Sequence, residues 1–280
     1  MERRHFFGSL AAAGLLPYVW RMDAIEAAPR PEPLKLGLAS YSVRNFKTLD
    51  QCLDMAKALD VKYINFKDVH LPRTLSAEEL KAARAKVEAA GFTITGGGTI
   101  TFRNDEKQVR SDFEYAKNAG MPLIVGAPST DSLDLVEKVA KEYKIKVAIH
   151  NHGPEDKFFP SPYDAYKAIK GRDPLMGLCI DIGHSLRAGA DPAKAVLDLK
   201  DRVYDMHVKD LTDFKTAKSQ VIVGKGNIDF PALFRALLKI KFTGNVALEY
   251  EIDADNPMPG MLQSMAYVRG VLAALTSSTT

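Results

Sequence analysis

The chain has 280 residues, of which 46% are apolar, and a formal net charge of +3. This length suits one large domain or two small ones, and the apolar content is sufficient for a globular core. So slight a charge argues against a nucleic-acid groove or an anionic membrane surface as the main partner. Cys52 and Cys179 are too few for a disulfide framework or a cysteine-based zinc site, and we expect both to be small buried side chains.

Residues 1–28 have the pattern of an export signal. Arg3 and Arg4 precede the apolar run FFGSLAAAGLLPYVW, and the small residues of EAAP follow it, with a cleavage zone near Ala28. The paired arginines resemble the twin-arginine type, although Glu2 before them departs from that pattern. A retained amphipathic helix is the alternative, but two prolines bound the apolar stretch. We expect a mature protein that is exported to the periplasm, with no membrane segment after the signal is removed.

From residue 34 onward one unit repeats, namely an apolar strand, a polar or glycine-bearing loop and an amphipathic helix. The predicted strands are 35–41, 62–67, 92–96, 122–127, 145–150, 176–181, 203–209 and 245–250. The predicted helices are 48–59, 77–90, 105–118, 132–143, 162–170, 192–199, 231–240 and 260–275. Eight alternating units predict an α/β fold, a single-domain (β/α)8 TIM barrel over residues 29–280. No glycine-rich dinucleotide fingerprint follows the first strand, which disfavours an open doubly wound sheet.

Side chains in the later strands alternate between two chemically different faces. In the strand at 145–150, Val147 and Ile149 share one face, whereas Ala148 and His150 share the other. In the next three strands the corresponding second faces hold Gly177, Cys179 and Asp181; Asp205, His207 and Lys209; and Asn245, Ala247 and Glu249. We expect the large apolar side chains to face the helices. The ionisable groups then arrive at the C-terminal strand ends, where barrel active sites form.

The histidines gather at predicted strand ends. Apart from His5 in the export signal, they are His70, His150, His152, His184 and His207. A single such histidine is often a satisfied core or rim residue, and this alternative is strongest for His70. For the whole set it is weak, because Asp181 and Glu249 converge on the same mouth and buried ionisable groups need partners or a metal.

Four of these groups should point inward at one height: His150, Asp181, His207 and Glu249. Two imidazoles and two carboxylates suit one divalent ion such as Mn²⁺, Co²⁺, Fe²⁺ or Zn²⁺ better than Mg²⁺ or Ca²⁺, and we favour Mn²⁺. The carboxylates would cancel the charge of the ion. Its open coordination positions would act as a Lewis acid toward substrate oxygens.

Five segments together carry a family resemblance: IHNHG, CIDIGH, MHVKD, GKGNIDF and FTGNVALEYE. They resemble the sugar phosphate isomerase/epimerase superfamily, the xylose isomerase-like TIM barrels, over nearly all of residues 34–275. The resemblance implies that Asp181, His207 and Glu249 bind a divalent metal and that His184 contacts substrate. It also implies a small sugar substrate, and the slight net charge predicts no nucleic-acid partner. It leaves open whether the chain forms a homo-oligomer.

One position departs from the family pattern. The strand-five ligand of these proteins is usually a glutamate, in a pattern like LENHG, and here it is His150. Family epimerases use that glutamate and the strand-eight glutamate, here Glu249, as an acid/base pair. A metal-bound imidazole cannot take that part, so proton transfer would pass to His152, to Lys67 or to a water beside the ion. His152 has a suitable ordinary pKa, whereas Lys67 suits oxygen binding better, unless it is only a rim lysine.

Further candidates for substrate binding carry weaker signals. Tyr41, Arg44 and Lys209 could hold sugar hydroxyls, and each could equally be a packing or rim residue. His70 completes this group of predicted substrate contacts.

The favoured function is a metal-dependent sugar or keto-sugar isomerase or epimerase that abstracts a proton next to a carbonyl. His150 replaces one of the two glutamates that form the family's acid/base pair. A lyase or hydratase acting on 3-keto-sugars or glycosides by β-elimination therefore has nearly equal weight. An endonuclease IV-like phosphodiesterase is a weaker alternative, since it needs three zinc ions and a basic surface. A sugar-binding barrel without catalysis is the last.

Overall fold

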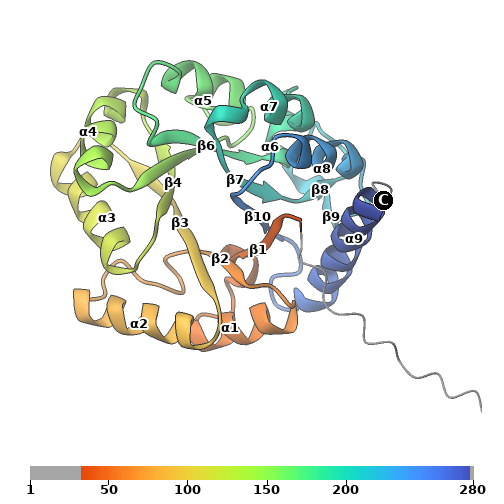
Figure 1. The fold of residues 1–280 in the computed structure, drawn as a ribbon, viewed down its shortest axis with the longest axis horizontal. Helices are drawn as coiled ribbons and strands as arrows, with labels where there is room; N and C mark the ends of the chain where they lie inside the picture. Colours follow the sequence, from red (N-terminus) through yellow and green to blue (C-terminus); the bar gives the residue numbers. More distant parts are fainter. Residues whose placement is uncertain (1–32, 278–280) are drawn as a thin grey trace, which may run out of the picture. The chain divides into compact units, whose positions relative to one another are not determined.

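Eight apolar segments pair side by side as parallel strands and close on themselves in the computed structural model, which describes residues 33–277 (Figure 1). The order around the barrel is β1, β10, β7, β6, β5, β4, β3, β2 and back to β1. The strands are β1 (Lys35–Ala39), β2 (Tyr63–Phe66), β3 (Thr93–Phe102), β4 (Leu123–Pro128), β5 (Lys146–His150), β6 (Met176–Asp181), β7 (Val203–Val208) and β10 (Asn245–Leu248). The predicted TIM barrel is confirmed. The predicted export signal lies outside the described residues.

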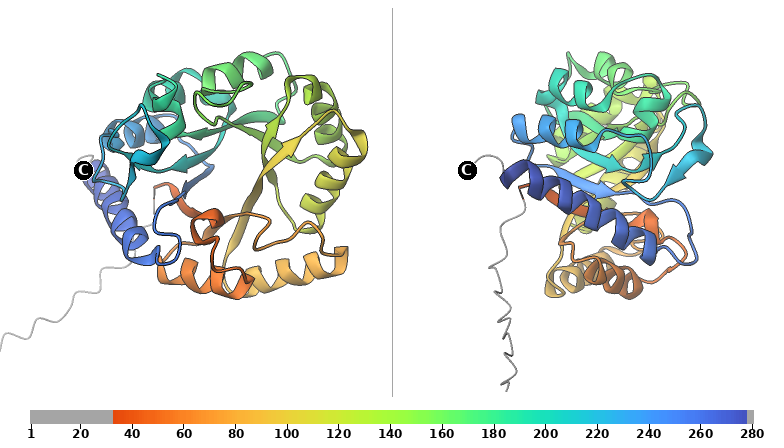
Figure 2. Two further views of the ribbon diagram at one scale, coloured as in Figure 1. Left: turned by 180° about the vertical axis from the view of Figure 1, so that it is seen from behind. Right: turned by 90° about the vertical axis from the view of Figure 1, so that its right-hand side faces the viewer.

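The helices pack around the outside of the barrel (Figure 2). They are α1 (Leu49–Ala58), α2 (Ala77–Ala89), α3 (Glu106–Asn118), α4 (Leu133–Tyr143), α5 (Pro162–Ile169), α6 (Ile182–Arg187), α7 (Pro192–Asp198), α8 (Phe230–Lys239) and α9 (Met258–Ser277). Several begin at a side chain that accepts a hydrogen bond from the first turn: Thr48, Ser76 and Ser161 form capping boxes. These caps satisfy backbone donors that the helix itself leaves free.

Two elements near the site were not predicted. Helix α6 follows β6 without a loop, because Asp181 ends the strand and caps the helix. A short antiparallel ribbon, β8 (Asp210–Leu211) with β9 (Gln220–Val221), follows β7. The right-hand view of Figure 2 shows this ribbon projecting at one end of the barrel. Both elements lie in the segments that follow the C-terminal ends of barrel strands. These segments are too short for a sequence period to reveal a helix or strand.

The predicted alternation of faces is confirmed in the core. Met176, Leu178 and Ile180 belong to the large apolar cluster between strands and helices. Ala148 and Cys179 belong instead to a small separate cluster. Small residues on the inner face leave the barrel axis free for polar side chains at the strand ends.

The loop GKGN after β9 is organised by one buried carboxylate. Asp210 accepts hydrogen bonds from the backbone N–H groups of Gly224, Gly226 and Ile228. Gly224 has a φ of +93°, and a Cβ on Gly226 would meet the Asp210 carboxylate at 2.2 Å. The N–H groups of this glycine-rich loop therefore serve an internal anion.

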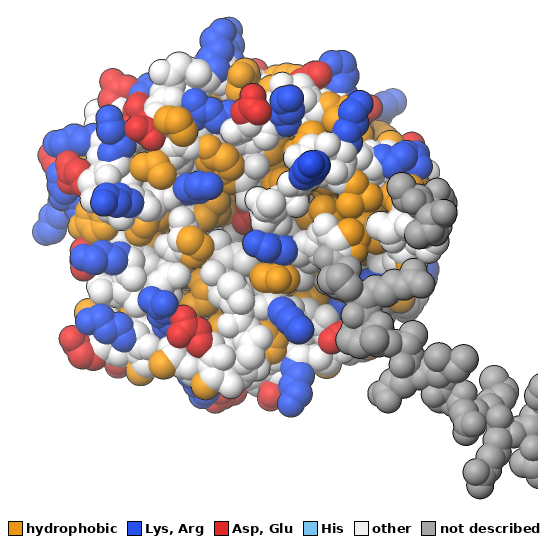
Figure 3. Space-filling model, in the orientation of Figure 1, with side chains coloured by type: hydrophobic (Ala, Val, Ile, Leu, Met, Phe, Trp, Pro, Cys, Tyr) orange, Lys and Arg blue, Asp and Glu red, His pale blue; other side chains and the backbone are white. Residues whose placement is uncertain are grey.

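The surface facing the viewer of Figure 1 carries dispersed charge. Figure 3 shows Lys and Arg side chains lying among Asp and Glu on this face, without a continuous basic stripe. Within residues 33–277, no helix has both the length and the apolar character needed to cross a membrane.

Asp205 on β7 lies buried at the barrel axis, where it accepts hydrogen bonds from Asn65 Nδ2 and from the Met206 N–H. Burial raises the pKa of Asp205 from 3.8 to about 6. The folded protein therefore disfavours the ionised form, and this penalty is complete above pH 6 and absent below the unfolded pKa.

We expect Asp205→Asn to raise the free energy of unfolding at pH 8 by on the order of 2 to 3 kcal/mol, because about two pKa units of penalty are removed. The gain should vanish near pH 4. Urea titrations at both pH values measure it, with the exposed Asp201→Asn as control. Equal stability of variant and parent at pH 8 would contradict this account.

Candidate active site

Four ligand-type side chains meet at the C-terminal ends of adjacent strands. His150 ends β5, Asp181 ends β6, His207 lies on β7 and Glu249 follows β10 directly. One ligand atom from each lies within 4.8 Å of all the others. The first three side chains are fully buried or nearly so, and Glu249 is 12% exposed. The structure thus brings together all four predicted metal ligands.

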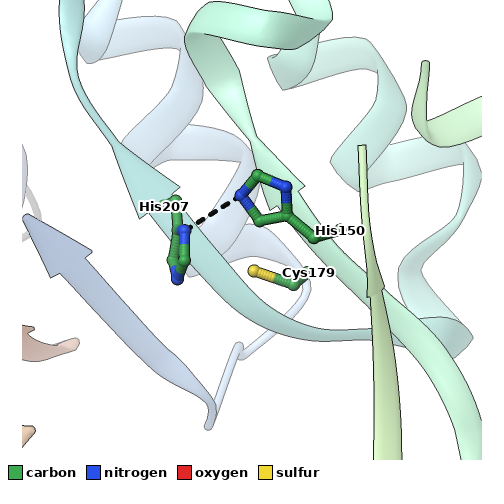
Figure 4. Close-up of side chains that lie close together, drawn as sticks. All are labelled: His150, Cys179 and His207. Carbon is green, nitrogen blue, oxygen red and sulfur yellow. Dashed lines mark hydrogen bonds between the residues drawn. The ribbon is translucent and has the colours of Figure 1, made fainter. Parts of the chain in front are cut away.

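Short contacts link these four groups in a row. His150 Nε2 lies 3.6 Å from Asp181 Oδ2 and 3.0 Å from His207 Nδ1. His207 Nδ1 lies 3.2 Å from Glu249 Oε2. Figure 4 shows the two imidazoles turned toward one another, each reaching in from its own strand.

Helix α6 and the residue after His150 fix the orientation of Asp181. Its Oδ1 accepts a hydrogen bond from the His184 N–H at the start of α6, which leaves Oδ2 to face the cluster. Asn151 exchanges hydrogen bonds with the Asp181 backbone and also donates to Ser185 Oγ. The strand ends that carry His150 and Asp181 are therefore held in register by side chains as well as by the ladder.

Lys209 places a buried ammonium against the carboxylates. Its Nζ lies 3.0 Å from Asp181 Oδ2 and 2.9 Å from Glu249 Oε2, and it is also paired with Glu251. Lys209 was predicted to hold sugar hydroxyls, but in this structure its donors face protein carboxylates. Glu251 was not singled out by sequence reasoning; its signal was the second acidic residue of LEYE.

The charged neighbours dominate the pKa values in the cluster. Burial alone would raise the pKa of Asp181, but Lys209 and His184 hold it well below its ordinary range. Burial is likewise outweighed at Glu249, whose pKa is lowered chiefly by His207 and Lys209. Both carboxylates are therefore ionised at neutral pH.

The two imidazoles differ although they are adjacent. Burial lowers the pKa of His150 to about 3, so its ring is neutral. Burial also opposes protonation of His207, but Cys179 and Glu249 raise its pKa well above the ordinary value. A cation that binds here replaces the His207 proton, because an imidazole ligand must be neutral.

Cys179 lies beside this cluster. It is buried as predicted, yet its Sγ forms a second ligand-type group with His150 and His207 (Figure 4). Burial raises the pKa of the thiol to about 12, so it stays protonated. The group that contains both carboxylates is better suited to a dication, since it supplies two negative charges.

A cavity of about 390 Å³ opens above the ligands, and His152, Lys67, Tyr41 and His184 line it. The His152 ring centre lies 4.3 Å from that of His150, and its Nδ1 lies 3.3 Å from Asp156 Oδ2. Burial lowers the pKa of His152, so the free imidazole can accept a proton at neutral pH. The pairing of His152 with Asp156 was not predicted. The two residues lie four positions apart in a loop, and loop sequences have no regular spacing that would indicate such a contact.

Among the remaining predicted residues, Lys67 lines the cavity, whereas Arg44 and His70 do not. Lys67 donates to the Thr99 carbonyl with an Nζ–O distance of 3.2 Å while lining the cavity. Arg44 stacks on the Tyr41 ring and donates to the Glu251 carbonyl, so it supports the rim without lining the cavity. The prediction for His70 is corrected by its hydrogen bonds.

Both ring nitrogens of His70 are occupied at 2.9 Å, Nδ1 by Ser40 Oγ and Nε2 by the Phe46 carbonyl. The ring is 97% buried and does not line the cavity. The predicted substrate contact is therefore wrong, and His70 instead fixes the loop after β1.

The chain matches a family model. Residues 53–271 match the model described as xylose isomerase-like TIM barrel. The chain belongs to this family. The resemblance seen in the sequence motifs is thereby confirmed.

Curated relatives within the family are distant. An inosose dehydratase of Geobacillus kaustophilus is 26% identical over 152 residues, covering 49% of each chain. An inosose dehydratase of Clostridium tetani is 26% identical over 155 residues, covering 49% of this chain and 51% of the relative. The chain thus spans about half the length of the curated relatives it matches.

Solved structures of similar fold cover nearly the whole barrel. An uncharacterized protein of Parabacteroides distasonis is 28% identical, with a TM-score of 0.67 over 85% of this chain and 99% of that one. The IolI protein with a binding zinc atom is 18% identical, with a TM-score of 0.74 over 86% and 99%. An L-ribulose 3-epimerase is 15% identical, with a TM-score of 0.72 over 88% and 96%. At such identities the last two show the fold alone.

The residues present fit one divalent ion. Two carboxylates and two imidazoles converge within coordination reach, and two buried ring nitrogens of this cluster, His150 Nδ1 and His207 Nε2, have no hydrogen-bond partner among the described residues. Asp181 Oδ2 faces the cluster beside Lys209 Nζ and would be a ligand.

We expect Asp181→Asn and Glu249→Gln each to lower the affinity for Mn²⁺ by at least tenfold, because each removes an anionic ligand at nearly constant volume. Glu251→Gln is the matched control and should keep the ion, since the Glu251 side chain pairs with Lys209 and is not one of the four ligand-type groups. Metal analysis and calorimetric titration measure the effect. Stoichiometric, tight Mn²⁺ binding by either ligand variant would remove that residue from the site.

Lys209→Met should destabilise the metal-free protein by about 3 to 5 kcal/mol, because it leaves buried carboxylates unpaired. Added Mn²⁺ should restore more stability to this variant than to the parent, since the ammonium no longer repels the cation. Thermal melts with EDTA and with Mn²⁺ test both statements, and exposed Lys218→Met serves as control. If Mn²⁺ binds more weakly to the variant, Lys209 positions the ligands and does not compete with the ion.

Proposed function

We propose that the protein is a metal-dependent enzyme that removes a proton next to the carbonyl of a sugar or keto-sugar. The observation that carries this proposal is the meeting of His150, Asp181, His207 and Glu249 within 4.8 Å, below a cavity that His152 enters. A bound divalent ion would polarise the substrate carbonyl as a Lewis acid.

His152 is the proposed base. Its ring lies at the cavity wall and is 34% exposed, so a substrate carbon can approach it. Asp156 orients the ring through Nδ1 and stabilises the imidazolium that forms. Lys67, Tyr41 and His184 are placed to hold substrate oxygens along the same wall.

Isomerisation or epimerisation follows when the enediolate is protonated at a new position or on its other face. Glu249 also lines the cavity, and His207 separates it from His150 on β5. Glu249 is the proposed second acid/base. The L-ribulose 3-epimerase that shares the fold is compatible with this outcome.

Elimination is the second candidate. The lowered pKa of Glu249 makes it a poor proton donor, so an enediolate that waits for reprotonation can instead expel a group from the neighbouring carbon. The curated relatives are named as dehydratases, which eliminate water. His150 in place of a family glutamate removes the other carboxyl acid from the site.

Deuterium exchange tests the proton abstraction whatever the product. The Mn²⁺-loaded protein is incubated in D₂O with a panel of ketoses, aldoses and 3-keto-glycosides, and carbon-bound deuterium is measured by NMR. We expect exchange next to the carbonyl of at least one class. A product lacking water or an aglycone assigns the lyase, and a new stereoisomer assigns the epimerase. No exchange across the panel in a metal-loaded sample would contradict the proposal.

His152→Ala should keep the ion and slow exchange by roughly 10²- to 10⁴-fold, the usual value of a positioned base. His150→Ala should instead weaken metal binding, and excess Mn²⁺ should restore part of its exchange. His150→Glu restores the family carboxylate and should shift the product toward epimerisation. Normal exchange by His152→Ala would transfer the role of base to Lys67.

A further inference from the structure

A second cavity of about 270 Å³ adjoins the metal cavity. His184 and Glu251 line both, so the two spaces share a wall. The second cavity lies between α6 and the β8–β9 ribbon, and its polar lining is Arg187, Lys209, Lys218 and Gln220. The proposed chemistry in the first cavity makes no use of this space.

Arg187 at the end of α6 is a buried guanidinium with an unused donor. Its side chain is only 4% exposed. Its Nη1 lies 3.3 Å from His184 Nδ1, and Nη2 donates to Glu155, whose side chain is 66% exposed. Nε has no hydrogen-bond partner within residues 33–277. A buried, unsatisfied charged donor beside a cavity is costly unless a ligand completes it.

The charged side chains that line this cavity are mostly cationic: Arg187, Lys209 and Lys218 against Glu251. Lys209 is neutralised by Asp181, Glu249 and Glu251. Glu251 is the one acidic side chain in the lining, and Lys209 engages it. Lys218 is exposed and has no ion pair with the described part of the chain. The partner of Arg187, Glu155, is 66% exposed and does not line the cavity, so Arg187 and Lys218 form the cationic part of its wall.

We propose that the second cavity binds the carboxylate of an acidic second unit of a two-part substrate, whose reacting sugar ring lies in the metal cavity. This inference rests on the proposed function. One guanidinium edge and one ammonium match a singly charged carboxylate, which accepts parallel N–H bonds. His184 and Glu251, at the shared wall, contact the substrate where its two units join. The metal cavity of about 390 Å³ lies at the small end for ligand sites, whereas the pair of cavities accommodates a glycoside.

Two disaccharides that differ only in the carboxylate test this assignment. Cellobiose and 4-O-β-D-glucuronosyl-D-glucose are titrated calorimetrically into the Mn²⁺-loaded protein at low ionic strength. We expect the acidic disaccharide to bind at least tenfold more tightly, and the preference to shrink at high salt. Equal affinities would overturn the proposal. Because binding is measured without turnover, the result does not depend on whether exchange is found.

Variants locate the preference. Lys218→Gln, at an exposed site that tolerates change, should reduce the preference severalfold, and Arg187→Gln should abolish it. Both changes should weaken binding of the acidic disaccharide more than binding of cellobiose. Lys81→Gln on the far helix α2 is the matched charge control and should have no effect. If the preference survives in the Lys218 and Arg187 variants but is lost in Asp181→Asn, the carboxylate binds at the metal site and the proposal is wrong.

Discussion

The buried ammonium of Lys209 is the constraint on which the site depends. Asp181, Glu249 and Glu251 surround it, and each would be costly to bury without it. The same contacts hold two of the candidate ligands in place when no ion is present. The raised pKa of His207 completes this arrangement, because a proton on its ring supplies a further positive charge beside Glu249. These contacts thus keep the carboxylates buried, ionised and in position to bind a dication.

Rigid backbone supports this charge cluster from two sides. Asn151 ties β5 to the start of α6, and Asp210 gathers the glycine loop that follows the β8–β9 ribbon. Gln220 on β9 reaches the backbone on both sides of Tyr250, bonding at Glu249 and Glu251. The unpredicted α6 and β8–β9 elements therefore form the frame of the site and also the walls of the second cavity.

The sequence predicts the barrel and the convergence of four ligand-type side chains well, because both follow from strand periodicity. Alternation assigned His150, Asp181, His207 and Glu249 to the axis, and equal strand-end positions brought them to one height. Pairings that involve loops had no such period. The Glu251 contact of Lys209 and the Asp156 contact of His152 depend on loop paths, and His70 was misassigned because its partners, Ser40 and the Phe46 carbonyl, lie in a 3₁₀ turn and a loop.

The charge count gives the His150 replacement a physical meaning. With neutral imidazoles, a divalent ion and Lys209 balance Asp181, Glu249 and Glu251, so the loaded site is neutral. In the proposed reaction, proton transfer from substrate to His152 would create an oxyanion and an imidazolium together, so the site would stay neutral throughout. A glutamate in place of His150 would add a negative charge at the ion and oppose the oxyanion. In the proposed reaction the substrate oxyanion would supply the negative charge that the family's strand-five glutamate supplies, which would favour formation of the enediolate over its reprotonation from the β5 side.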